Sequence, residues 1–143
     1  MPIDHTNLFD LFTERVEVAS NGIPITAEVR FYLTAVLMEW VRSDRSTYSE
    51  DTMAELFLRA DAAHINRKAA IYRELGDRSL ILIGVFKPSV ERKIVSTSYY
   101  VDMGSAAYYR THLWYNAAFG EVFKDMATQF ENCAAVIEGS MGL

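Results

Sequence analysis

Apolar residues recur every three or four positions along most of this chain, and this spacing constrains the fold more than any other feature. The clearest case follows Thr26, a residue that can cap the first turn of a helix. One face of that helix would carry Val29, Leu33, Val36, Leu37 and Trp40. Because such a face must be buried against other elements, the spacing predicts packed amphipathic helices.

Other stretches show the same period. One covers residues 7–20. Another opens with Thr52 and Glu55, which have the spacing of a capping box, and it continues until Gly76 is expected to end it. Asp77 would then cap the next helix.

The C-terminal part reads as helix from Ser98 to about Ile137, with a break near Gly120. Its second half has apolar residues in alternating steps of four and three, which is the seam of a helix packed along a neighbour. The seam consists of Phe119, Phe123, Met126, Phe130, Cys133 and Ile137. It predicts a contact inside a bundle or, alternatively, between two subunits.

Residues 79–101 allow two interpretations. Residues 79–86 and 93–100 are rich in β-branched and apolar side chains, so a hairpin is one possibility. An isolated hairpin in a helical chain would lack a third strand, however, and the sequence before it has helix-capping chemistry. We therefore expect a short buried helix over residues 78–86 and an all-α bundle of about five to seven helices. The alternative is an α+β fold with a hairpin at residues 79–101.

The length and the net charge of the chain limit the functions that it can have. The 143 residues suit one domain, residues 1–143, with no repeat or linker. A net charge of -5 argues against binding to a nucleic-acid backbone. No apolar run is long enough for a membrane span, and Cys133 is the single cysteine, so we expect a cytoplasmic protein whose cysteine packs in the core.

A polar stripe on the helix after Ser98 is the strongest candidate for a ligand site. It consists of Ser98, Asp102, Ser105, Tyr109, His112 and Asn116. The stripe is either the solvent side of the helix or a groove with hydroxyls, a carboxylate and an imidazole for a ligand. Asp102 and His112 are too far apart along one helix to form a catalytic triad with a serine.

Histidines offer little for a metal. Asp61 and His64 are one helical turn apart, but a metal site in a bundle needs further ligands. His64 could instead bind a haem or a small ligand from the edge of an apolar face. We expect no metal and no cofactor.

Tyrosines gather on the same helix as the polar stripe, and each combines a rigid apolar ring with a polar tip. The residues that could form an interface are Tyr99, Tyr108, Tyr115, Phe123 and Phe130. Gly84 and Gly104 lie among large apolar residues, so we expect the helices of residues 78–86 and 98–116 to cross there at the centre of the bundle.

Two stretches resemble motifs of a group of small uncharacterised bacterial proteins. They are Leu75-Gly76-Asp77-Arg78-Ser79-Leu80 with Gly84 and Phe86, and Tyr99-Tyr100-Val101-Asp102-Met103-Gly104 with Ala107-Tyr108. The resemblance implies an all-helical bacterial domain and no particular activity, cofactor or catalytic residue.

The chain shows no catalytic constellation, no phosphate-binding loop and no basic patch. We therefore expect a non-enzymatic protein-interaction or regulatory module that acts as a homo-oligomer. The alternative is a helical protein that binds a small ligand or haem through His64, Asp102, Tyr109 and His112.

Overall fold

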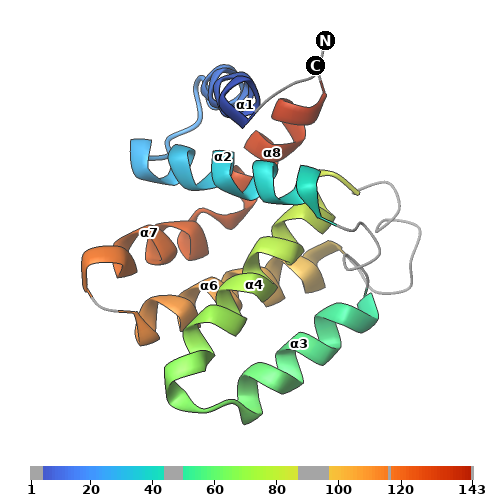
Figure 1. Cartoon of the computed structure of the whole chain (residues 1–143), viewed down its shortest axis with the longest axis vertical. Helices are drawn as coiled ribbons and strands as arrows, with labels where there is room; N and C mark the ends of the chain where they lie inside the picture. The colour runs from blue at the N-terminus through green and yellow to red at the C-terminus, as the bar shows by residue number, and fades with distance from the viewer. Residues whose placement is uncertain (1–4, 44–49, 87–96, 116, 143) are drawn as a thin grey trace.

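The computed structural model describes residues 5–43, 50–86, 97–115 and 117–142, and in these ranges every regular element is a helix (Figure 1). The all-α prediction is confirmed. Residues 79–84 and 97–101, which belong to the two arms of the alternative hairpin, are helical, and residues 87–96 between them lie outside the described ranges. The helices are α1 (His5–Ala19), α2 (Ala27–Arg42), α3 (Glu50–Ala62), α4 (Ile65–Gly84), α6 (Thr97–Trp114), α7 (Ala117–Thr128) and α8 (Phe130–Met141).

Helix α4 runs through the middle of the molecule, and the other helices cover it from several sides (Figure 1). It packs most extensively against α6, and it also contacts α3 and α8. Within the segment expected to be buried, residues 79–84 are buried, whereas Arg78, Val85 and Phe86 are partly exposed. This central position explains why that segment is apolar on every face and so resembles a strand in sequence.

Glycines let α4 approach its neighbours closely. A Cβ on Gly76 would lie 2.6 Å from the ring of Tyr108 in α6, and one on Gly104 would lie 2.9 Å from Ser79 Cβ in α4. Gly84, by contrast, faces α8, where a Cβ would lie 2.5 Å from Ile137 Cγ2. The predicted crossing of the two central helices is thus correct at Gly104 and wrong at Gly84.

Several predicted helix ends are wrong. Gly76 does not end a helix, because α4 continues through it to Gly84. The periodic segment before it breaks instead at residues 63–64, between α3 and α4. Asp77 is therefore inside a helix and caps nothing. Thr52 also lies inside its helix, since α3 begins at Glu50.

The C-terminal part differs from the prediction in a similar way. Gly120 lies within α7, and the helical run is interrupted before Ala117 instead. The apolar seam continues across a second break at Gln129, between α7 and α8. Its side chains from Phe123 to Ile137 are buried in the core, and Cys133 is fully buried among them as predicted.

The start of α2 matches its prediction. The hydroxyl of Thr26 accepts a hydrogen bond from the N–H of Val29 at 3.1 Å, which satisfies a free donor of the first turn. Within the described residues no helix has both the length and the apolar character needed to cross a bilayer.

Candidate functional site

The polar stripe of α6 lies mostly on the outer side of the bundle. Asp102 and Tyr109 are exposed, and the ring of Tyr109 lies 5.9 Å from that of the partly buried His112. Ser105 points inward, and its hydroxyl donates a hydrogen bond to the carbonyl of Ala127 at 2.6 Å. These side chains do not converge on one pocket, so the stripe is mainly a solvent face.

His64 lies outside the stripe, in the connection between α3 and α4. It precedes α4 as an exposed residue, and its Nδ1 lies 3.1 Å from Oδ1 of Asn66. Asp61 is also exposed, at the end of α3. Among the described side chains no three histidines, cysteines or carboxylates cluster as they would around a metal ion. The structure does not bring His64 together with Asp102, Tyr109 and His112.

The five aromatic residues expected at an interface divide into two groups. Tyr108, Phe123 and Phe130 are 0%, 5% and 2% exposed and belong to the core. Tyr115 is partly buried, and Tyr99 is 52% exposed. Only Tyr99 therefore presents much of its ring to a partner in this fold.

The most unusual polar group is one to which the sequence assigned only a capping role. Asp77 lies in the middle of α4, partly buried, and its Oδ1 accepts two hydrogen bonds. The hydroxyl of Tyr32 in α2 donates one and the hydroxyl of Tyr108 in α6 donates the other, each at 2.7 Å. One carboxylate oxygen thereby connects three helices.

The second oxygen of this carboxylate, Oδ2, forms no hydrogen bond with any described residue. A carboxylate can accept about four hydrogen bonds, so Asp77 keeps unused acceptor capacity. The residue lines a groove between α2 and α4, where a bound molecule could reach that oxygen.

Burial raises the pKa of the Asp77 carboxyl from 3.8 to about 6. The hydrogen bonds from Tyr32 and Tyr108 and the positive charge of Arg73 lower this pKa, while Glu74 raises it. Burial likewise raises the pKa of both tyrosines, and the charge of Asp77 adds to the effect. Both hydroxyls therefore remain donors at neutral pH, and the charged carboxylate is held at some energetic cost.

The groove has two parts that meet at Tyr32 and Arg73. The polar arm, about 560 Å³, lies between α2 and α4. Its charged lining residues are Glu39, Arg73, Glu74, Asp77 and Arg78. Glu74 and Arg78 pair with each other at 2.5 Å, one helical turn apart.

The apolar arm, about 680 Å³, lies between α2 and α7 beside the end of α6. Its ring-bearing and aliphatic lining residues are Phe31, Tyr32, Tyr115, Val122 and Phe123. The ring of Phe123 packs edge-on to Tyr32 at 5.2 Å and stacks on Tyr115 at 5.3 Å. These contacts fix the aromatic wall before any ligand arrives.

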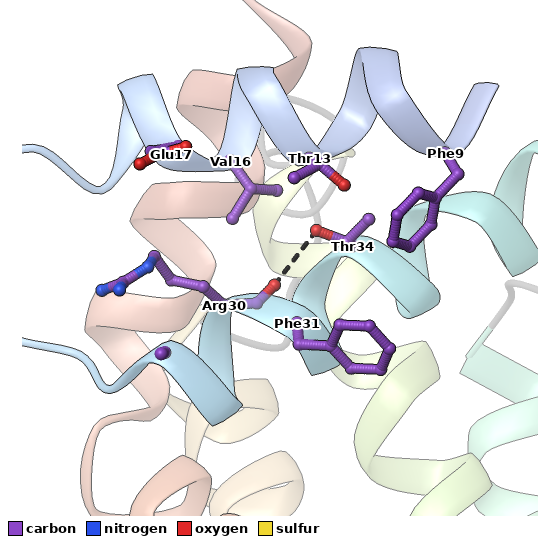
Figure 2. A pocket seen from close by; sticks show the side chains of 8 residues that line it. Phe9, Thr13, Val16, Glu17, Arg30, Phe31 and Thr34 are labelled. Atoms are coloured by element: carbon purple, nitrogen blue, oxygen red, sulfur yellow. Dashed lines mark hydrogen bonds between the residues drawn. The ribbon is translucent and has the colours of Figure 1, made fainter. Parts of the chain in front are cut away.

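Two other hollows are less suited to a small ligand. Figure 2 shows the first, between α1 and α2, with Phe9 and Phe31 at one end and Glu17 and Arg30 at the other. Its volume of about 250 Å³ is below the range of roughly 300–1,000 Å³ usual for ligand pockets. The second, about 500 Å³, lies between α3 and α6 and is almost entirely apolar.

The sequence held only a weak signal for the Asp77 site. Its partners lie 45 and 31 residues away, so no local spacing joins them. The usable signal was an acid shortly before the apolar run of residues 80–86. Both motifs of the resemblance also meet here, since Gly76 and Asp77 contact Tyr108.

Comparisons of the chain with protein-family models, with curated proteins and with solved structures gave no match.

Proposed function

We propose that this chain is a non-enzymatic binding module that takes a small amphipathic molecule in the groove beside Asp77. The observation that carries the proposal is the partly buried carboxylate with one oxygen fully engaged and the other open to the groove. Keeping a carboxylate charged in a partly buried place costs free energy, and such groups occur often at binding sites.

The shape of the groove supports the same proposal. Each arm has a volume typical of a ligand site, and the rings of the aromatic wall pack against one another. An apolar body would displace water from the aromatic arm, while a polar end would reach the charged groups of the polar arm. Tyr32 and Arg73 line both arms, so one molecule can contact the two at once.

Native mass spectrometry of protein purified without refolding tests the proposal. We expect the wild-type chain to retain an added mass, and Ala27→Trp to lose it, because Ala27 is an exposed residue lining the apolar arm. Ala106→Trp is the matched control, since Ala106 is exposed on α6 and lines neither arm. A retained mass that survives Ala27→Trp would contradict the proposal, as would a protein that neither retains nor takes up any small molecule.

A second candidate function, self-association, has its own observation. The hollow between α3 and α6 is bordered by Leu58, which is 70% exposed, and by Tyr99, which is 52% exposed. Phe57 and Met103 line the same recess, and among its described lining residues Asp102 alone is charged. A two-fold interface needs a projection and a recess on one face, and this face has both. We therefore propose a second copy of the chain as its partner.

Light scattering coupled to size-exclusion chromatography tests this second proposal. We expect a dimer that Leu58→Glu converts to a monomer, because a buried unpaired charge would oppose association. Val18→Glu is the control, since Val18 is 59% exposed on α1 and distant from that recess. A wild-type monomer at high concentration would refute self-association and leave the groove proposal unaffected.

A further inference from the structure

Two opposite charges in the groove interact with each other but keep hydrogen-bonding capacity that no described residue uses. Asp77 has its free Oδ2, and Arg73 forms no hydrogen bond or ion pair with a described residue. The two residues are one turn apart on α4, which places their Cβ atoms roughly 5–6 Å apart. Arg73 is exposed and lines both arms. A negative and a positive site therefore lie side by side at the junction of the arms.

The remaining charges of the groove do not change this pattern. Glu74 and Arg78 neutralise each other by direct contact. Glu39 and Glu28 are exposed and line opposite arms. Because carboxylates outnumber guanidinium groups among the described lining residues, a purely anionic ligand such as a fatty acid is disfavoured. A simple amine would leave Arg73 without a partner.

We infer that the groove binds a free amino acid with an apolar side chain, its ammonium group on Asp77, its carboxylate on Arg73 and its side chain in the apolar arm. This inference rests on the proposed binding function and names the class of ligand. The ammonium group supplies donors for Oδ2, which the two tyrosines leave open. The guanidinium of Arg73 can hold a carboxylate through two parallel hydrogen bonds.

Isothermal titration calorimetry with three related compounds tests the inference. The compounds are L-phenylalanine, 2-phenylethylamine, which lacks the carboxylate, and 3-phenylpropionate, which lacks the ammonium group. We expect L-phenylalanine to bind wild-type protein roughly tenfold or more tightly than either truncated compound, because each of them loses a charge-assisted interaction.

Two variants then assign each charge. Asp77→Asn should lower the affinity for L-phenylalanine roughly tenfold, because the partner of the ammonium group is lost. The affinity for 3-phenylpropionate, which has no ammonium group, should not fall. Arg73→Gln should weaken L-phenylalanine and leave 2-phenylethylamine no weaker. Asn keeps an oxygen for both tyrosine donors, and Arg73 is exposed, so both variants should fold. Their melting temperatures check this.

Three results would overturn the inference. Equal affinity for 2-phenylethylamine and L-phenylalanine would indicate a simple amine or a peptide N-terminus. If neither variant changes the affinity for L-phenylalanine, the amino acid binds outside the junction of Asp77 and Arg73. If neither L-phenylalanine nor L-leucine binds, the proposed class of ligand is wrong. The proposed binding function would still stand if native mass spectrometry shows a retained mass that Ala27→Trp removes. Without such a mass, both the function and the inference would be refuted.

Discussion

At the scale of single residues, Asp77 has two properties with opposite effects on the stability of the fold. Its hydrogen bonds from Tyr32 and Tyr108 tie α2 and α6 to α4, which stabilises the bundle. Its negative charge opposes that gain, because desolvation favours the neutral acid. A neutral side chain of the same shape would keep the ties without the charge.

This conflict predicts how stability depends on pH. The folded pKa of about 6 exceeds the unfolded value of 3.8, so the folded protein binds more protons between these values. The contribution of neutral Asp77 to the free energy of unfolding is therefore fully present below pH 3.8 and is lost as the pH rises through about 6. In Asp77→Asn this decline should be absent, and at neutral pH the variant should be at least as stable as wild type.

Urea denaturation midpoints measured from about pH 4 to about pH 8 check the pH prediction. The groups that face Asp77 are Tyr32 from α2, Tyr108 from α6, and Arg73 and Glu74 from α4 itself. Glu39→Gln is the control, because it removes an exposed carboxylate from the same groove. An Asp77→Asn profile that parallels wild type would show that Asp77 does not titrate in this range.

The sequence could identify Asp77 as a polar residue near a glycine but could not reveal its partners. Capping chemistry was the local explanation of Gly76-Asp77, and it was wrong because a distant ring fills the space beside Gly76. A glycine at the end of a helix usually has a positive φ, yet in the described residues only Gly22 has one, at 82°. Tertiary contacts decided the role of both residues.

At the scale of helices, periodicity predicted the existence of the elements better than their ends. The α2 helix is correct because its cap and its apolar face are both local features. The seam from Phe123 to Ile137 keeps its buried face across the break at Gln129, so the sequence pattern alone did not reveal two helices. Breaks without glycine or proline leave no strong signal.

The close approach of α6 to its neighbours predicts the effect of a larger side chain. Gly104→Leu should destabilise the fold by about 1–3 kcal/mol, because added atoms would meet Ser79 and the ring of Phe130. Ala106→Leu, on the exposed side of the same helix, is the matched control and should have little effect. Equal urea midpoints for the two variants would place Gly104 outside the packed crossing.

At the scale of the whole molecule, the groove results from how the helices surround α4. Helix α6 packs closely on α4 through its glycine, whereas α2 contacts α4 at few positions. The space between α2 and α4 is therefore only partly filled, and α7 closes one end with Phe123. No segment of the sequence contains this arrangement, so the site could not be predicted without the fold.

Unfolding of the whole bundle can be followed through Cys133, which is fully buried. Burial raises the pKa of its thiol to about 12. A thiol reagent should label the native protein at least roughly a thousandfold more slowly than the unfolded chain, because labelling requires opening. Val18→Cys in a Cys133→Ala background is the control and should react at once, since Val18 is 59% exposed. Rapid labelling of native Cys133 would mean that α8 opens locally.

Helices α1 and α8 lie against each other, so the first and the last described helices of the chain are in contact (Figure 1). The core also takes Val136 and Ile137 from α8, both fully buried. During synthesis, the apolar faces of α1 and α4 that α8 covers therefore stay exposed until α8 has left the ribosome. Contacts between distant segments also slow folding, because a long loop must close before they form. We therefore expect this bundle to fold only once α8 can pack against α1 and α4.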